Sequence, residues 1–529
     1  MRRTFAISVA MLAAGGALFG AALAEPAATG PEIRRGGTFR ISMYTGVAGF
    51  GSVDPALVDS LASDLVVQST CARLMNFRDA RLPEGFRVVP EVAARMPRVS
   101  GNGRVYTFTL RGGQRFSNGA PVPPAAFTRA IERARALGDV AFVDFPLAQE
   151  IAATRARGRT LAITLRRPMP NFPARLALAF CAIPRGLPAD PEGAAAPIHS
   201  PAPYYIAELV RGRRVVLLRN RFYRGIRPQR VDRFLIDLGR PREEVIRDIE
   251  RGRADWGWVP AADVFERGRE LQRRYGLNRA RFWVSPGLFL RGFVFNTRRP
   301  LFRNNARLRR AINFAVDRPA LLRERGYLAG RLTDQYLPPG MPGFRDAKIY
   351  PLRRPDLRRA RALARGHLRG GKAVLYVCHL ELCAAQGQIL RRNLRGIGLD
   401  VDVRSFANLF GRMAQRGEPW DIGWLGFNAP PDPYDMLEMF DGRNLDDPFT
   451  NFGHFSLPRF NRLFRQAERL QGSARYRAYG RLDVLLAREA APFVAYSFDN
   501  TPTLVSARVD RRCIVLRPEL DLAAVCLKR

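Results

Sequence analysis

The segment from residue 372 to residue 406 constrains the fold more than any other part of the chain. It begins with KAVLYVC, continues with CAAQGQILRRNLRGIG and ends with LDVDVRSF. The first and last stretches have the apolar pattern of strands, and the middle one has the spacing of a helix that closes at a glycine. Two strands joined through a helix lie parallel in one sheet. The segment therefore predicts an α/β fold.

Other parts of the chain repeat this alternation. RRVVLLRN and VDRFLIDL have the pattern of short strands, and residues 242–260 that of a helix, a glycine turn and a strand with Trp256 and Trp258. FLRGFVFNT predicts a further strand, and residues 306–326 predict a helix that Pro319 divides. We expect largely parallel sheets covered by helices.

The start of the chain has the pattern of an export signal. Arg2 and Arg3 precede an apolar run that ends in Ala22, Leu23 and Ala24. This predicts a secretory signal peptide, residues 1–24, cleaved before Glu25. The RRTF start also resembles a twin-arginine signal, so the export route stays open. No second apolar run has membrane-spanning length. We expect a mature protein in the periplasm or another extracytoplasmic, oxidising compartment.

The formal net charge of +38 raises the question of nucleic-acid binding. All of the 86 basic residues except Lys348, Lys372 and Lys528 are arginine, and they are scattered without a compact tract. A nucleic-acid binder usually concentrates its charge on one stripe and carries a recognisable motif. We therefore expect no nucleic-acid partner, with a secreted polyanion-binding protein as the alternative function.

Six cysteines in an exported chain favour disulfide bonds, and six allow 15 pairings. Cys378 ends a predicted strand and Cys383 opens the next helix, close enough for a tight bridge. Cys513 and Cys526 flank a segment that we interpret as a hairpin, which leaves Cys71 to pair with Cys181.

VCHLELC, residues 377–383, also permits a metal site made of Cys378, His379 and Cys383. The oxidising compartment favours the disulfide instead, so we expect no metal and no cofactor. The four histidines lie in no metal or catalytic-triad motif, and no G-x-S-x-G, P-loop or H-E-x-x-H sequence occurs. We therefore expect no enzyme, although a metal-dependent hydrolase is a third hypothesis.

Four long stretches, in order, carry a family resemblance. They are VYTFTLRGGQRFSNGAPV (105–122), YYIAELVRGRRVVLLRN (204–220), FNTRRPLFRNNARLRRAINFAVDRPAL (295–321) and WDIGWLGFNAPPDPYDML (420–437). With these the chain resembles family 5 of the extracytoplasmic solute-binding proteins of ABC transporters, the peptide, oligopeptide and nickel group. The resemblance runs from about Gly36 to about Leu504.

The resemblance implies a two-lobed α/β fold of the class II periplasmic-binding-protein (Venus-flytrap) type, with an extra subdomain on the first lobe. Carried onto this chain, the first lobe comprises residues 25–55, 200–288 and 496–529, and residues 56–199 form its subdomain. The second lobe comprises residues 289–495. Two hinge strands would join the lobes.

The function that the resemblance implies is capture of a small solute between the lobes and delivery to an ABC importer. The expected partners are a peptide-like or other solute and the permease subunits in the membrane, and we expect a monomer. Ligand-selected closure of the hinge would create the surface that the permease recognises.

Candidate ligand contacts lie in GWLGFNAPPDPYD. Trp424 and Phe427 are candidates for a pocket wall, Asn428 for a polar contact and Asp432 or Asp435 for a charge toward a cationic group. The alternative interpretation is that Trp424 belongs to the strand core and PPDP forms a turn. Peptide binders of the family place an aspartate shortly after the tryptophan, where this chain has Phe427 and Asn428. That departure puts peptide specificity in doubt.

The stretch from residue 428 to residue 449 holds six acids against Arg443 alone. A negative patch there would favour a cationic solute, and a solvated acidic loop is the alternative interpretation. On the first lobe, Tyr44 and Thr45 end the first predicted strand, and ligands of open α/β sheets lie at the carboxyl ends of strands. Trp258 is a further candidate, with core packing as its alternative.

Overall fold

The computed structural model describes residues 35–45, 50–58, 60–141, 144–187, 196–428, 430–447, 449–515 and 520–528. The predicted signal peptide lies outside these residues, as does the loop of residues 46–49. No helix within the described ranges is both long enough and apolar enough to cross a bilayer.

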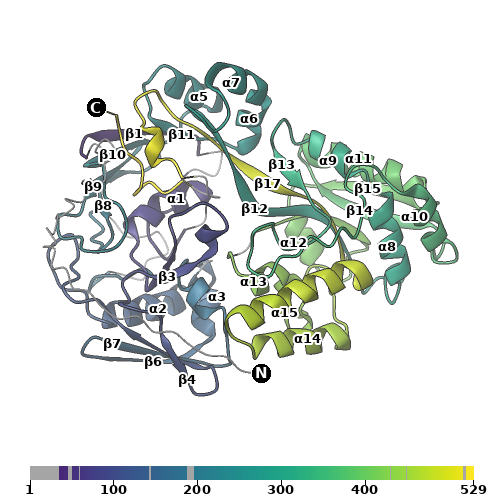
Figure 1. Ribbon diagram of the computed structural model, residues 1–529, viewed down its shortest axis with the longest axis horizontal. Helices are drawn as coiled ribbons and strands as arrows, with labels where there is room; N and C mark the ends of the chain where they lie inside the picture. Colours follow the sequence, from purple (N-terminus) through teal and green to yellow (C-terminus); the bar gives the residue numbers. More distant parts are fainter. Residues whose placement is uncertain are drawn as a thin grey trace, which may run out of the picture.

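The chain folds into two lobes joined by two long strands that cross between them (Figure 1). These are β12 (Phe282–Phe295) and β17 (Phe493–Leu504), which pair antiparallel over most of their length. Both are rich in apolar and aromatic residues, which suit a strand that is covered on both faces. The two-lobed α/β fold is the one that the sequence predicts.

The first lobe contains a five-stranded sheet of order β11-β1-β10-β9-β8. Its strands are β1 (Thr38–Met43), β8 (Tyr204–Val210), β9 (Arg214–Arg219), β10 (Arg233–Asp237) and β11 (Trp256–Trp258). The helices of this lobe are α1 (Leu61–Thr70), α5 (Arg242–Glu250), α6 (Ala261–Glu266) and α7 (Gly268–Tyr275). Strands β10 and β11 flank β1 and run parallel to it, so their carboxyl ends lie at the same edge.

Residues between α1 and β8 form a separate layer beside this sheet. A four-stranded antiparallel sheet of order β4-β5-β7-β6 and the pair β2-β3 pack with helices α2, α3 and α4 around their own apolar core. The strands are β2 (Met75–Phe77), β3 (Val88–Pro90), β4 (Arg98–Ser100), β5 (Val105–Thr109), β6 (Ile151–Arg157) and β7 (Thr160–Leu165). The helices are α2 (Ala125–Leu137), α3 (Asp144–Gln149) and α4 (Phe172–Arg175).

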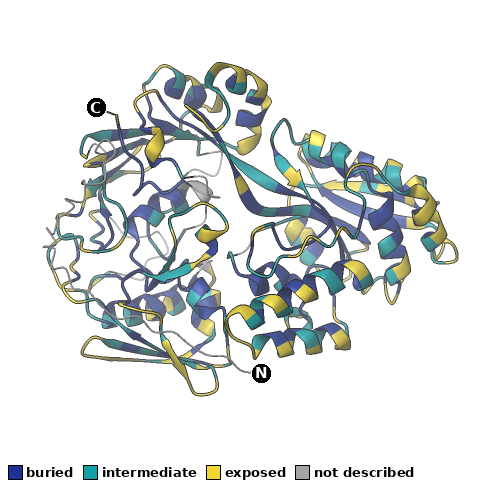
Figure 2. Cartoon of the chain, in the orientation of Figure 1, coloured by how far each residue is buried: buried dark blue, intermediate teal, exposed yellow. Residues whose placement is uncertain are grey.

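The second lobe is built on a six-stranded sheet of order β13-β17-β12-β16-β14-β15. Its remaining strands are β13 (Gly330–Leu332), β14 (Lys372–Cys378), β15 (Asp400–Phe406) and β16 (Ile422–Phe427). Its helices are α8 (Ala306–Ala315), α9 (Arg318–Arg323), α10 (Leu357–Ala364), α11 (Glu381–Arg395), α12 (Leu409–Ala414), α13 (Pro433–Leu437), α14 (Pro458–Glu468) and α15 (Gly472–Leu485). Buried residues follow the sheet, and exposed residues gather on the outer faces of α14 and α15 (Figure 2).

The prediction of largely parallel sheets is wrong. Strands β14, β15 and β16 are parallel, as their connecting helices require, but β12, β13 and β17 pair antiparallel. In the first lobe β8 and β9 form an antiparallel pair closed by a short turn. Each lobe therefore combines parallel α/β units with antiparallel strands, which come from a hairpin in the first lobe and include the crossing strands β12 and β17 in the second.

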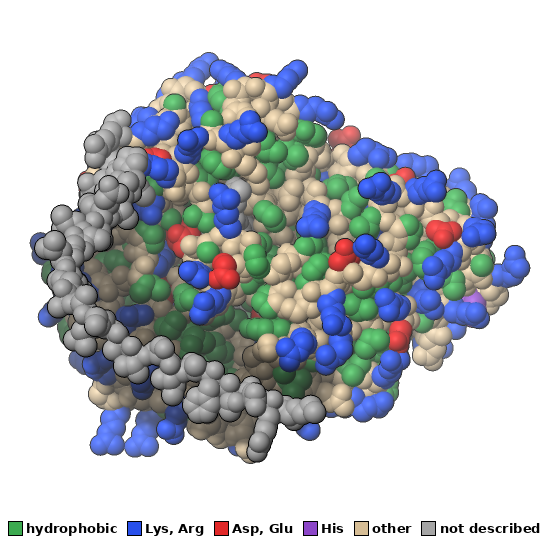
Figure 3. Space-filling view, in the orientation of Figure 1, with side chains coloured by type: hydrophobic (Ala, Val, Ile, Leu, Met, Phe, Trp, Pro, Cys, Tyr) green, Lys and Arg blue, Asp and Glu red, His purple; other side chains and the backbone are tan. Residues whose placement is uncertain are grey.

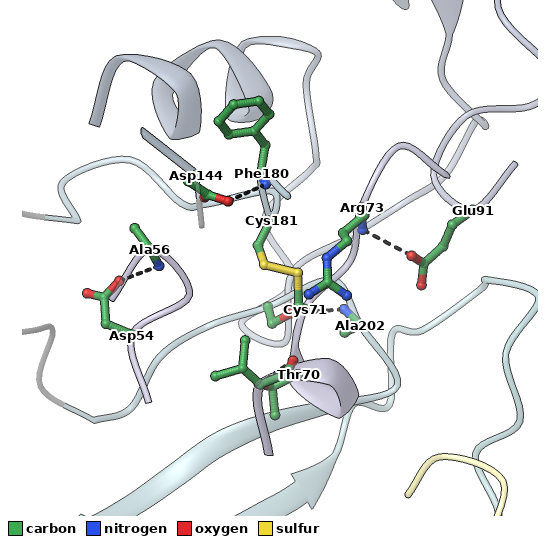
Figure 4. The surroundings of a disulfide bond; sticks show 12 residues. Asp54, Ala56, Thr70, Cys71, Arg73, Glu91, Asp144, Phe180, Cys181 and Ala202 are labelled. Carbon is green, nitrogen blue, oxygen red and sulfur yellow. Dashed lines mark hydrogen bonds between the residues drawn. A yellow bond between two sulfur atoms is a disulfide. The ribbon is translucent and has the colours of Figure 1, made fainter. Parts of the chain in front are cut away.

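All three predicted disulfide bonds are confirmed: Cys71–Cys181, Cys378–Cys383 and Cys513–Cys526. The first ties the end of α1 to the segment after α4, with Arg73, Glu91 and Asp144 around it (Figure 4). The hairpin expected between Cys513 and Cys526 is absent from the described part of that segment, which forms a short 3-10 helix and turns.

Candidate functional site

The carboxyl edge of the first-lobe sheet brings two of the predicted residues together. Tyr44 and Trp258 follow or end the neighbouring parallel strands β1 and β11, and the Tyr44 N–H donates to the Trp258 carbonyl over 3.0 Å. Both side chains are half-buried, as is Thr45. The Arg242 guanidinium lies 5.7 Å from the centre of the Tyr44 ring. The two rings lie on opposite faces of the sheet, because Trp258 packs against the cluster of Phe39 and Ile41 and Tyr44 against that of Val245 and Ile249.

On the second lobe, Trp424 and Phe427 do not form a single wall. Both belong to β16, and an odd number of steps along a strand turns side chains to opposite faces. Trp424 is buried and donates its indole N–H to Gln386 Oε1 of α11 over 2.8 Å, while Phe427 is half-buried against the core on the other face. Asn428, directly after the strand, is exposed.

Asp432 has a structural partner. Its carboxylate accepts Arg475 Nη1 and Nη2 over 2.7 and 2.6 Å, and both residues are buried. It also caps α13 by accepting the Tyr434 N–H. We therefore do not carry Asp432 forward as a ligand contact.

The rest of the acidic stretch is also largely paired. Asp435 and Glu438 bind Arg175, and Asp441 binds Arg443. With Asp432, four of its acids thus face guanidinium groups. Asp446 and Asp447 are exposed, so within the described part of the stretch the open negative surface is confined to these two residues at its end.

Arg175 joins the two lobes directly. It extends from α4 of the first lobe, and its Nη2 lies 2.5 Å from Asp435 Oδ1 and 2.5 Å from Glu438 Oε2 of the second. Asn171 Nδ2 also donates to Asp435 Oδ1 over 2.8 Å. Burial raises the pKa of Asp435 to about 7 although Arg175 opposes that rise. The lobes meet a second time on the other side of the crossing strands, where Tyr327 donates to Gln272 of α7.

The face of the sheet that holds Trp424 carries polar residues that the sequence analysis missed. Arg291 of β12 lies with its guanidinium carbon 3.9 Å from the centre of the Phe289 ring and 5.5 Å from that of Trp424. Its Nε donates to Asp499 Oδ2 over 2.8 Å, and Arg325 Nη2 donates to the same oxygen over 2.8 Å. The sequence does contain a signal for these two residues. Arg291 is the only charged residue of the 14-residue strand β12, and Asp499 is the only charged residue of β17.

The Cys378–Cys383 loop lies near the end of β16. Strand β14, which Cys378 ends, is parallel to β16, so the carboxyl ends of both strands lie at one edge of the sheet. The loop therefore shares that edge with Phe427. Within the described ranges no group of three or more His, Cys, Asp or Glu residues is arranged to hold a metal ion.

One cavity, of about 570 Å³, lies between the lobes beside α6 and β13. Phe265 and Arg269 line it from the first lobe, and Leu322, Tyr327 and Leu332 from the second. None of the predicted site residues lines it.

Comparison with known proteins gives concordant matches. A sequence model described as bacterial extracellular solute-binding proteins, family 5 middle, matches residues 87–446. The oligopeptide-binding protein OppA of Bacillus subtilis (strain 168) is 22% identical over 457 residues, which cover 79% of this chain and 80% of OppA.

Solved structures match over nearly the whole chain. A clavulanic acid biosynthesis oligopeptide binding protein superposes with a TM-score of 0.80 at 22% identity, covering 94% of this chain and 97% of its own. The periplasmic binding protein DppA from Helicobacter pylori, in complex with the peptide STSA, superposes with a TM-score of 0.71 at 18% identity and covers 94% and 99%. At these identities the structural likeness concerns the fold.

Proposed function

Because this chain belongs to family 5 of the bacterial extracellular solute-binding proteins, we propose that it captures one small solute between its lobes and delivers it to an ABC importer. The observation that carries the proposal is the pair of strands β12 and β17, which forms the crossing between two otherwise separate sheets. Such a connection lets the lobes open and close around a bound molecule.

We propose a peptide-like or related solute. The curated relative and two of the matched structures are named for peptide or oligopeptide binding, which supports this class. Peptide binders of the family have an aspartate shortly after the tryptophan, where this chain has Phe427. A peptide ammonium group would therefore need another partner in this chain. The exact solute therefore has to be identified from the protein itself.

The proposed contacts come from both lobes. Tyr44, Thr45 and Trp258 are the proposed contacts from the first lobe. Trp424 and Asn428 are the proposed contacts from the second, whereas Phe427 is set aside because it points to the opposite face of β16. Aromatic side chains with a few polar groups are the usual lining of such sites. In this proposal the protein acts as a monomer outside the cytoplasm, after removal of residues 1–24, and its macromolecular partner is the permease.

Native mass spectrometry of the protein as purified tests the proposal. We expect a stoichiometric small molecule that is lost on denaturation, and small-angle scattering should show compaction when that molecule is returned to stripped protein. Salt-sensitive binding to DNA without any small ligand would instead support the polyanion-binding alternative. Metal-dependent turnover would support a hydrolase.

A further inference from the structure

Arg291 stands where β12 leaves the crossing and enters the sheet of the second lobe. In the sheet it is the direct neighbour of Gly426 on β16 and Ser497 on β17. Its strand is otherwise apolar except for Ser285, and a charged side chain in such a strand costs free energy unless it is paired or used. The position therefore calls for a specific explanation.

The guanidinium is held in place on three sides. Phe289 and Trp424 flank it, and Asp499 fixes Nε over 2.8 Å. Gly426 leaves the room that this packing needs, because a methyl group at that position would collide with Arg291 Nη1 and the Phe289 ring. A planar cation is thus oriented before any ligand binds.

The two terminal nitrogens of Arg291 remain available. Among the described residues neither Nη1 nor Nη2 has a hydrogen-bond acceptor, whereas Nε is satisfied. The side chain is 16% exposed, so a small molecule can reach it. Two parallel N–H donors of this kind match the two oxygens of a carboxylate.

The surrounding atoms point to the same conclusion. Arg291 and Arg325 share the single carboxylate of Asp499, which leaves one positive charge uncompensated within this cluster. Burial lowers the pKa of Arg291, as expected for a cation with too little countercharge. Among the described residues Ser497 Oγ and Arg325 Nε, which can donate to a carboxylate, are buried without hydrogen-bond partners. Asp499 Oδ1 is also without one, and it would need a hydroxyl or N–H of the same bound molecule. Buried polar atoms are normally satisfied, so several unsatisfied ones together mark a place for a bound polar molecule.

We propose that Arg291 binds a carboxylate of the solute, held against the Phe289 and Trp424 rings with Asp499 as the residue that positions the guanidinium. The inference rests on the proposed function and gives the solute a chemical class, an organic acid with an apolar or aromatic part next to the carboxylate. It reverses the expectation of a cationic solute.

The test uses the full mature protein and a defined panel of short alanine- and phenylalanine-containing peptides and aryl carboxylic acids, each with its neutral amide. Titration calorimetry gives affinities. We expect wild type to bind at least one acid and to discriminate against its amide. Arg291→Met should bind that acid about ten- to a hundredfold more weakly, the loss for one charge-assisted contact. Arg291→Lys keeps the positive charge but not the two parallel N–H donors, so its affinity for the acid should lie between those of wild type and Arg291→Met.

Arg331→Met is the matched control, since Arg331 is exposed on β13 of the same sheet. It should bind as wild type does. Circular dichroism and melting curves show whether each variant is folded. If Arg291→Met does not fold, the affinity of Arg291→Lys for the acid decides the test. Equal binding of acid and amide, or wild-type affinity in Arg291→Met, overturns the inference while the capture function stands. If nothing in the panel or in the purified protein induces compaction of wild type, the capture function fails and the inference falls with it.

Discussion

Asp432 and Arg475 form a buried ion pair at the start of α13, with side chains 6% and 5% exposed. Removing one partner of such a pair leaves a buried charge without compensation. We expect Asp432→Asn to lower the free energy of unfolding by about 3–5 kcal/mol, measured by urea denaturation.

Asp237→Asn is its control, because the Asp237–Arg214 pair is 47% and 46% exposed. That substitution should cost about 1 kcal/mol or less. Similar losses in both variants would show that burial does not determine the strength of these pairs.

His454 predicts a pH dependence. Burial, assisted by the nearby Arg298, lowers its pKa to about 4. The unfolded chain, with an ordinary histidine pKa near 6.5, takes up a proton first on acidification, so stability is lost as the pH falls from about 7 toward 4. We expect this group to contribute about 1 kcal/mol between pH 7 and 5, after allowing for solvent that reaches the half-buried ring.

Asn in place of His454 should remove that contribution. The residue has a φ of 47°, which asparagine tolerates better than most residues, and asparagine does not titrate. The difference in unfolding free energy between wild type and His454→Asn, measured across this pH range, isolates the histidine from the acids that titrate there. A constant difference would contradict the assignment.

Single residues also show where the sequence analysis reached its limit. Trp424 was proposed as a ligand contact because it lies in a recognisable stretch, and this stays a prediction. Asp432 was proposed as a ligand contact because its partner Arg475 lies 43 residues away in the sequence. Arg291 and Asp499 are 208 residues apart, and only the pairing of β12 with β17 brings them together. Contacts between distant segments of this kind are not encoded in local pattern.

At the scale of elements, the Cys71–Cys181 and Cys378–Cys383 disulfides differ chiefly in the length of chain that they close. Cys71–Cys181 spans 110 residues and Cys378–Cys383 spans 5. In the chain-entropy model these loops correspond to about 5 and about 2 kcal/mol of stabilisation. We expect the double variant Cys71→Ala with Cys181→Ala to lose clearly more stability than Cys378→Ala with Cys383→Ala, by urea denaturation without reductant.

The alanine variants lose the packing of the sulfur atoms as well as the bond. Wild type under reducing conditions separates the two effects, because reduction breaks the bonds and leaves the sulfur atoms in place. Its loss should equal or exceed that of the first double variant. Equal losses in the two double variants would argue against the loop-length explanation.

The elements themselves were largely predictable. The pattern of residues 372–406 gave β14, α11 and β15, and Pro319 correctly divided α8 from α9. The direction of the strands was harder to predict from the sequence. Strand β12 pairs antiparallel with β16 and β17, which are far from it in the sequence, and local patterns do not show such pairings. The hairpin expected after Cys513 failed because an apolar segment can also be buried as turns when a disulfide holds its ends.

At the scale of the whole molecule, basic side chains are scattered over the uncovered part of the face seen in Figure 3 rather than gathered in one stripe. This distribution agrees with scattered arginines in the sequence. Other arginines are buried or half-buried with acidic partners, as Arg475, Arg175 and Arg227 show. Net charge alone is therefore a poor guide to what the molecule binds.

The contact of Arg175 with Asp435 and Glu438 links the lobes at one point, so it should bias the equilibrium between closed and open forms. Arg175→Met leaves two acids facing the first lobe without a countercharge. We expect the ligand-free variant to have a larger radius of gyration by small-angle scattering than ligand-free wild type. Solute binding should weaken as well, because closure then costs more; about 1.4 kcal/mol of lost contact corresponds to a tenfold shift.

Arg219→Met is a matched control, since Arg219 lies on β9 of the first lobe and binds Asp232 of the same lobe over 3.1 Å. It removes one charge without removing a contact between the lobes, and its scattering should match that of wild type. If Arg175→Met also scatters as wild type does, the remaining contacts are sufficient to hold the lobes together. If both variants expand equally, loss of positive charge rather than loss of the Arg175 contact sets the separation, because only the charge change is common to them.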